Sequence, residues 1–134
     1  MKKVLLDTDT ISYFFRNNHN VRVKVDNYIK IHQFVNISVI TYYEVLNGLY
    51  YKDAKKQLQR FLEFSVLNKI LPLTKESAKI SAKISSHLRT TGKTVDHNDI
   101  LIAGIAIENN FTLITNNSNH FARIPDLEIE NWSI

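Results

Sequence analysis

Three acidic residues lie beside long apolar runs, in segments that are far apart along the chain. Asp7 follows the first apolar run, Glu44 lies just past the run at residues 34–40, and Asp99 directly precedes the run at residues 100–107. In an open α/β sheet the carboxyl ends of the strands border one crevice, so acids from these segments would meet there. Converging carboxylates repel one another and stay ionised at low cost only when a cation joins them. These positions therefore indicate a metal site built from oxygen ligands.

Each acid also has a purely structural interpretation. Glu44 stands three residues after Thr41, which is the spacing of a capping box at the start of a helix. Asp96 and Asp99 have the same spacing, and either can cap the next helix or face its positive end. Asp7 can accept hydrogen bonds within a turn. Both interpretations stay open for each residue alone, but three caps need not fall at one end of a sheet, which favours a shared site.

Polar residues flank two of these positions. Thr8 adjoins Asp7, and a hydroxyl beside a ligating carboxylate can hold its orientation. Three roles stay open for Asp9: it could cap the helix, support a metal ligand from behind, or contact the metal through a water molecule. A strand expected at residues 111–115 leads into three polar residues, Thr115, Asn116 and Asn117. Amide oxygens can bind Mg²⁺ or its waters without adding charge, although an Asn-rich turn explains this segment equally well.

The composition is that of an ordinary globular protein. The chain has 134 residues, with 44% hydrophobic and 22% charged residues, and we expect one domain spanning 1–134. It contains no cysteine, which leaves neither a disulfide framework nor a thiolate zinc site. The sequence shows no uninterrupted apolar stretch of membrane-spanning length and no signal-peptide pattern, so we expect a cytoplasmic protein.

The chain is moderately basic, with a net charge of +4 and a pI of about 9.3. This balance is compatible with a polyanionic partner such as nucleic acid. A stripe of lysines at positions 75, 79 and 83 is best interpreted as a solvated helix face, while four further cations could border the crevice: Arg16, Arg89, Lys93 and Arg123. Among the histidines, only His97 attracts attention, because it lies close to Asp99 in the sequence.

Apolar periodicity predicts strands that alternate with helices. Strands are expected at residues 4–6, 35–39, 70–73, 111–115 and 127–130. Helices are expected at residues 10–15, 21–32, 41–51, 55–67, 75–89 and 98–110, the first of them capped by Asp9 or Thr10. This alternation indicates an α/β fold with an open, mostly parallel sheet of four to five strands and helices on both faces.

The ordered set of motifs resembles the PIN-domain ribonucleases of the VapC toxin family, from type II toxin–antitoxin systems. The resemblance covers essentially the whole chain. It is carried by an apolar strand that ends in Asp-Thr, a glutamate on the helix after the second strand, an aspartate that opens an Ile-Ala-rich helix, and a Thr-Asn-Asn strand end with an Asn-Trp tail. In this chain these motifs begin at Leu5, Ile40, Asn98, Leu113 and Asn131.

The resemblance implies roles for individual residues. Asp7, Glu44 and Asp99 take the three acidic metal positions, where Mg²⁺ or Mn²⁺ is expected. The fourth position, an aspartate in many relatives, falls on Asn117, which lowers the charge of the site. Asp96 is an alternative source of that missing charge.

The resemblance also implies a function and partners. We expect a Mg²⁺-dependent endoribonuclease that hydrolyses tRNA or another structured RNA with a metal-activated water, leaving 5′-phosphate and 3′-hydroxyl ends. A VapB-like antitoxin is expected to lay an apolar helix into a groove among the early helices, and a homodimer is expected as well. Adjacent aromatic residues at 42–43 and 50–51 point to different sides of one helix, which fits an apolar partner surface.

Two alternatives remain. The segment from Asp7 to Thr10 also resembles haloacid-dehalogenase phosphatases, in which the first aspartate is the nucleophile. That family favours Thr or Val where Ile11 stands, and it has a late acidic pair that is missing here. The other alternative is a catalytically silent PIN-like module that binds RNA or protein, against which the presence of all three acids argues.

Overall fold

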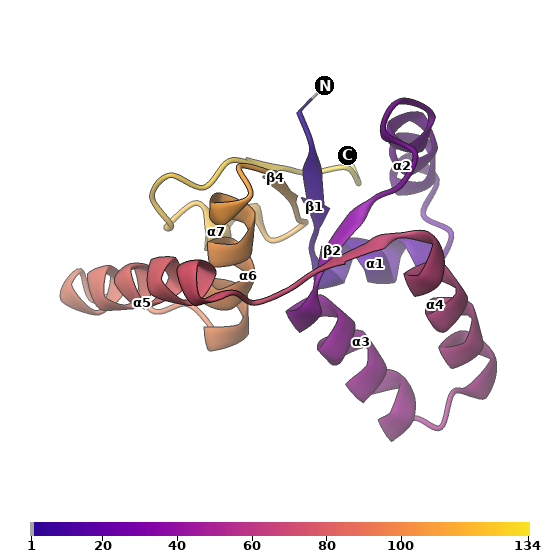
Figure 1. Cartoon of the computed structure of the whole chain (residues 1–134), viewed down its shortest axis with the longest axis horizontal. Helices are drawn as coiled ribbons and strands as arrows, with labels where there is room; N and C mark the ends of the chain where they lie inside the picture. The colour runs from indigo at the N-terminus through magenta and orange to yellow at the C-terminus, as the bar shows by residue number, and fades with distance from the viewer. Residues whose placement is uncertain (1) are drawn as a thin grey trace.

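A computed structural model describes residues 2–134 as alternating strands and helices (Figure 1). The elements in chain order are β1 (Val4–Leu6), α1 (Thr8–Phe15), α2 (His19–His32), β2 (Asn36–Ser38), α3 (Val39–Tyr51), α4 (Lys55–Leu67), β3 (Lys69–Leu71), α5 (Lys75–Thr90), α6 (His97–Glu108), β4 (Thr112–Ile114), α7 (Ser118–Phe121) and β5 (Ile129–Glu130). Across residues 2–134, every helix is too short or too polar to cross a membrane.

The five strands form one parallel sheet in the order β3-β2-β1-β4-β5. The predicted α/β fold with a parallel sheet is therefore confirmed. β1 is central, and Leu5 lies opposite both Asn36 of β2 and Leu113 of β4. The chain adds strands to one side of β1 first and then to the other, so the order reverses between β1 and β4. Such a switch point opens a crevice at the carboxyl ends of the two strands.

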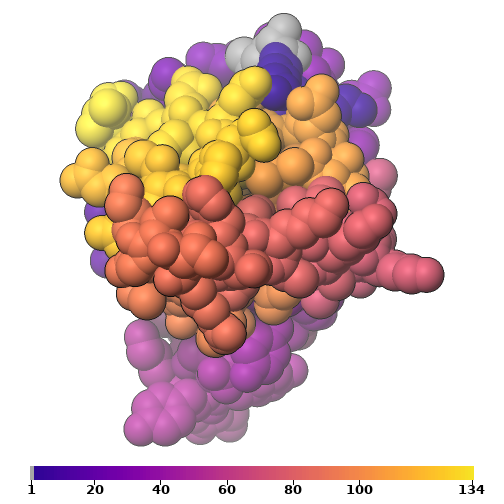
Figure 2. Space-filling view, turned by 90° about the vertical axis from the view of Figure 1, so that its left-hand side faces the viewer, coloured from indigo at the N-terminus to yellow at the C-terminus, as the bar shows by residue number. Residues whose placement is uncertain are grey.

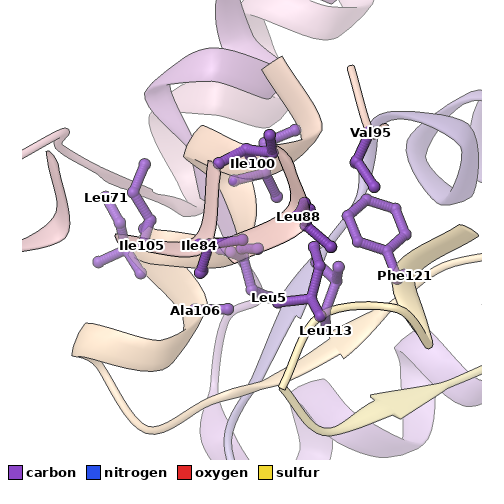
Figure 3. Packing of buried hydrophobic residues seen from close by; sticks show 13 residues of the cluster. Leu5, Leu71, Ile84, Leu88, Val95, Ile100, Ile105, Ala106, Leu113 and Phe121 are labelled. Carbon is purple, nitrogen blue, oxygen red and sulfur yellow. The ribbon is translucent and has the colours of Figure 1, made fainter. Parts of the chain in front are cut away.

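Alternate residues of the central strands serve two separate hydrophobic cores. Leu5 and Leu113 point to the face covered by α5, α6 and α7, and Figure 3 shows both beside Leu88 and the ring of Phe121. Their neighbours, such as Leu6 and Ile114, belong to a second core with α1, α2 and α4. Because successive side chains of a strand point to opposite faces, helices are needed on both sides of the sheet.

The helix that carries Asp99 is held by close packing against α5. Gly104 of α6 lies against the Ser77 carbonyl and the Ser81 side chain, and the Ser81 hydroxyl donates to the Ile100 carbonyl over 3.0 Å. Figure 2 shows α5 spread over the outside of this layer, with the C-terminal segment above it and the purple end of α3 projecting below. The first turn of α6 is thereby fixed relative to the sheet.

Two helix starts differ from the sequence-based expectation in ways that matter for the site. α1 begins at Thr8 with Asp7 in the capping position, so the prediction that Asp9 or Thr10 caps it was wrong. α3 begins at Val39 and is capped by Ser38, whose hydroxyl accepts from the amide of Thr41 over 3.0 Å. Each helix therefore starts directly at the end of its strand, leaving almost no loop. The four-residue helix α7 was not predicted either.

Candidate active site

A cleft of about 320 Å³ lies where β1 and β4 end, and four carboxylates line it. They come from α1, α3 and α6, together with the residue between β1 and α1. The lining consists of Asp7, Asp9, Glu44 and Asp99, with Thr8, Ser12, Arg16 and Asn117 between them. The three acids singled out by sequence, and the amide expected at a fourth position, are thus brought to one cleft by the switch point of the sheet.

Asp7 is the most deeply buried of the four acids, at 4% exposure. Its Oδ1 accepts from the backbone amide of Thr8 and its Oδ2 from the hydroxyl of Thr115, each over 2.8 Å. Burial, followed by repulsion from Asp9, raises the pKa of Asp7 to about 7, against the lowering effect of these two hydrogen bonds. The side chain is therefore fixed in place and poorly compensated in its charged form.

Asp9 and Thr10 tie α1 to the end of β4. An oxygen of Asp9 accepts from the backbone amide of Asn116 over 3.1 Å, and the Thr10 hydroxyl donates to the Ile114 carbonyl over 2.9 Å. The pKa of Asp9 is raised, mainly because the group is partly buried. Asp9 thus holds the segment after β4 against α1 while one side of its carboxylate borders the cleft.

Glu44 faces α1 and is not part of a capping box. Its Oε1 accepts from the hydroxyl of Thr8 over 2.7 Å, and its Oε2 lies 3.3 Å from the side-chain amide of Asn98. The Thr8 hydroxyl also lies 3.0 Å from that of Thr41. Because α3 starts at Val39, Glu44 falls beyond its first turn, where it can reach α1 and α6. Thr8 orients Glu44 through its hydroxyl and Asp7 through its backbone amide.

Asp99 lies beside a histidine that the sequence did not single out. Its Oδ2 lies 3.1 Å from Nε2 of His120, in α7. The pKa of Asp99 is raised, chiefly by burial; His120 opposes this rise, and repulsion from Asp96 and Glu44 adds to it. His120 and Asp99 are distant in sequence, so no spacing pattern could have paired them. His97, which had attracted attention instead, is exposed and borders a different pocket.

The other polar residues predicted for the site divide into those that border the cleft and those that support it. Asn117 borders the cleft, and its backbone amide donates to the Thr115 hydroxyl over 3.0 Å. Thr115 is fully buried behind Asp7. Asn116 contributes its backbone, while its side-chain amide is buried without a hydrogen-bond partner among residues 2–134. Asp96 occupies the capping position of α6, is exposed, and does not line the cleft.

The chemistry of these donors fits a hard divalent cation, although the ligand positions are not preassembled. Carboxylate and amide oxygens are the ligands that Mg²⁺ prefers, and the repulsion among the acids is what a cation would relieve. Within the described residues, however, no three acidic, His or Cys side chains are gathered closely enough to hold a metal. Glu44 and Asp99 are turned toward Thr8 and His120 instead, so a cation would require these two side chains to rotate.

An apolar groove of about 460 Å³ adjoins the acidic cleft, between α1, α3 and α4. Five side chains give it apolar walls, namely Ile11, Phe15, Val45, Leu49 and Phe61, and three cations border it, namely Arg16, Lys52 and Arg60. Thr8, Ser12, Arg16 and Glu44 line the groove and the cleft alike. A molecule seated in this groove would therefore reach the acidic residues.

Comparison with known proteins agrees with this architecture. The sequence profile of the PIN domain matches residues 4–127. Ribonuclease VapC2 of Rickettsia felis is 35% identical over 99 residues, which is 72% of each chain. The chain belongs to the PIN domain family, within its VapC group. The predicted relationship is thus confirmed, and the haloacid-dehalogenase alternative is not supported, because the PIN profile covers the segment around Asp7.

Other relatives of this PIN domain match over almost its whole length. The tRNA(fMet)-specific endonuclease VapC of Salmonella typhimurium is 28% identical, over 98% of this chain and 99% of the relative. The crystal structure of DNA-bound VapBC from the same organism superposes with a TM-score of 0.88 at 28% identity, covering 98% of this chain and 99% of that one.

Proposed function

We propose that the protein is a Mg²⁺- or Mn²⁺-dependent endoribonuclease toxin that hydrolyses phosphodiester bonds of tRNA or another structured RNA. The observation that carries this proposal is the meeting of Asp7, Glu44 and Asp99 in one cleft, on a PIN-domain scaffold. The three residues come from separate segments of the chain, and helix capping, which accounts for Asp7 alone, does not explain why all three carboxylates meet. The relatives named as a ribonuclease and as a tRNA(fMet)-specific endonuclease support the substrate class.

In this proposal Asp7, Glu44 and Asp99 hold the cation and Asn117 completes the site. When bound, the cation acidifies a water molecule and offsets charge that develops on the phosphate oxygens. Hydrolysis adds the water oxygen to phosphorus and breaks the bond to the 3′ oxygen, which takes up a proton. The products are 5′-phosphate and 3′-hydroxyl ends.

Hydrogen bonds within the chain position the carboxylates of the site. Thr115 and the Thr8 amide fix both oxygens of Asp7, so that this ligand does not have to be organised when the cation binds. The Thr8 hydroxyl and His120 hold Glu44 and Asp99 beside the cleft, and each of these two side chains must rotate to reach the cation. The hydrogen bonds from Thr8 and Thr115 also favour the ionised form of Asp7, which is the form that binds metal.

We further propose an antitoxin as the partner that fills the apolar groove. The groove has apolar walls of the kind that accept an amphipathic helix, and it opens into the acidic cleft. The related Salmonella structure is a VapBC complex.

A homodimer and a cytoplasmic location complete the proposal. The exposed rings of Tyr43, Tyr50 and Tyr51 offer apolar surface for a second copy, which light scattering after gel filtration can detect.

The test is cleavage of a tRNA(fMet) transcript by the purified protein in Mg²⁺, in Mn²⁺ and in EDTA. Wild type should cleave in either metal and lose activity in EDTA. Asp7→Asn and Asp99→Asn should cleave at least about 100-fold more slowly than wild type, because losing a ligand costs more than losing a residue that supports a ligand, which costs about 10- to 100-fold. Asp26→Asn changes an exposed acid outside the cleft and should cleave like wild type. Equal traces of activity in wild type and Asp7→Asn would identify a contaminant and leave the silent-module alternative. Growth arrest on expression, relieved by Asp7→Asn, tests the toxin role.

A further inference from the structure

Arg16 is the only cationic side chain that lines the acidic cleft among residues 2–134. The same cleft is lined by the four carboxylates of Asp7, Asp9, Glu44 and Asp99. An RNA strand is a polyanion, so ionised carboxylates repel it. One divalent cation carries only half the charge of four such groups. A phosphate that enters this cleft therefore needs an additional positive group, and Arg16 is placed to provide it.

The first helix fixes Arg16 at the border between the cleft and the groove. Thr8, Ser12 and Arg16 follow one another at intervals of four residues, so they lie along one face of α1. All three line both the acidic cleft and the apolar groove. This face of α1 begins beside the buried carboxylate of Asp7 and ends at Arg16, the C-terminal capping residue of the helix. A strand bound across the acids would pass the guanidinium as it leaves the cleft.

The guanidinium of Arg16 is also available to an external anion. Arg16 is exposed, and within residues 2–134 it forms no ion pair and no side-chain hydrogen bond, although four carboxylates line the same cleft. Its guanidinium carbon lies 5.0 Å from the centre of the Tyr13 ring, which limits the positions of the long side chain. Arg22 provides the contrast, because its Nε donates to the Phe14 carbonyl over 3.0 Å and its guanidinium covers the Phe14 ring.

We propose that the guanidinium of Arg16 binds an RNA phosphate next to the scissile bond and thereby holds the strand against the acidic cleft. This inference rests on the proposed ribonuclease function and names a substrate-binding residue for it. Guanidinium presents paired N–H donors that match two phosphate oxygens, which gives both charge and orientation. Ligation by the acids and phosphate binding by Arg16 then act on opposite ends of one helix face.

The test is binding of a fluorescein-labelled tRNA(fMet) transcript in EDTA, which prevents cleavage, at salt concentrations from 50 to 200 mM. Arg16→Ala should weaken binding about tenfold, as expected for loss of one charge-assisted contact. It should also reduce the slope of log Kd against log salt by about 0.7 to 0.9, as expected for one phosphate contact. Arg16→Lys should keep the slope and lose only part of the affinity, because lysine retains the charge without the paired donors.

Arg89→Ala is the control, since Arg89 is an exposed arginine near the end of its helix that lines neither the cleft nor the groove. It should bind RNA like wild type. Wild-type affinity and slope in Arg16→Ala, or an equal loss in Arg89→Ala, would overturn the role of Arg16 while leaving the ribonuclease proposal intact. Absence of RNA binding and cleavage by wild type would overturn both. Circular dichroism of each variant confirms folding, and Arg16→Lys preserves the test if Arg16→Ala does not fold.

Discussion

Replacing Asp7 by asparagine should stabilise the metal-free protein at neutral pH while removing its activity. Asp7 is 4% exposed, and burial raises its pKa from the ordinary value of 3.8 to about 7. In the unfolded chain the carboxyl ionises at its ordinary pKa. Between these two pH values the native state therefore holds a proton that the unfolded state has released, and the free energy of unfolding falls as pH rises.

The size of the effect follows from the two pKa values. A rise from 3.8 to about 7 corresponds to about 4 kcal/mol, at about 1.4 kcal/mol for each tenfold change in proton affinity. This stability is fully present below pH 4 and is lost by about pH 7. Asparagine resembles the protonated acid, so the variant keeps that stability at every pH. The Thr115 hydroxyl can donate its proton to the Asp9 carboxylate, which lies 3.5 Å away, and its oxygen can then accept from the new amide.

The assay is urea unfolding in EDTA at pH values from 4 to 8, with the difference between variant and wild type as the readout. The difference should be near zero at pH 4 and grow to as much as about 4 kcal/mol at pH 7.5, or a Tm increase on the order of 10 °C. Asp26→Asn, at an exposed position on α2, should show no such pH dependence. Added Mg²⁺ should raise the Tm of wild type more than that of Asp7→Asn, because the variant has lost one of the charged ligands.

Two results would refute this reasoning. An Asp7→Asn protein that is less stable than wild type in EDTA at pH 7.5 would mean that the Thr8 and Thr115 hydrogen bonds outweigh burial. A difference that does not change with pH would mean that the pKa of Asp7 is close to its ordinary value. Either outcome would contradict the argument that the ionised carboxylate of Asp7 is costly in this cleft until a cation binds.

Two further predictions concern the supports of the site. Gly104→Ala should destabilise the protein by about 1–3 kcal/mol in urea unfolding, because the added methyl group would lie 2.6 Å from the Ser77 carbonyl oxygen and against Ser81. Gly48→Ala is the control: a methyl group there would meet no atom within 4 Å and should stabilise the helix by about 0.5–1 kcal/mol. Equal effects of the two substitutions would contradict the argument that Gly104 is required by close packing. His120→Ala should raise the pKa of Asp99 further, because His120 favours the ionised carboxylate. Carboxyl ¹³C NMR titration of Asp99 measures this change, and an unchanged or lower pKa would show that the histidine contact does not form in solution.

The sequence by itself determined the class of fold and the positions of the acids. Alternation of apolar strands with amphipathic helices predicts a parallel sheet, and such a sheet brings the residues after its strands to one edge. Asp7 and Asn117 could be placed at this edge because each follows a buried strand, and Glu44 because its helix begins after a strand. Asp99 could be placed there because it opens a helix that leads into the fourth strand, and such a helix starts at the carboxyl edge of a parallel sheet. Helix starts were less well predicted, since Asp7 and Ser38 cap their helices directly at the strand ends.

Only the tertiary structure decided which groups meet the acids. The pairing of His120 with Asp99 and of Thr8 with Glu44 joins different elements, and such contacts depend on how helices pack over the sheet rather than on spacing along the chain. The same holds for Arg16, one of several unranked cations in the sequence, which packing places at the junction of the cleft and the groove. Local patterns fix where a residue lies on its own element, whereas the neighbours it acquires are set by the whole fold.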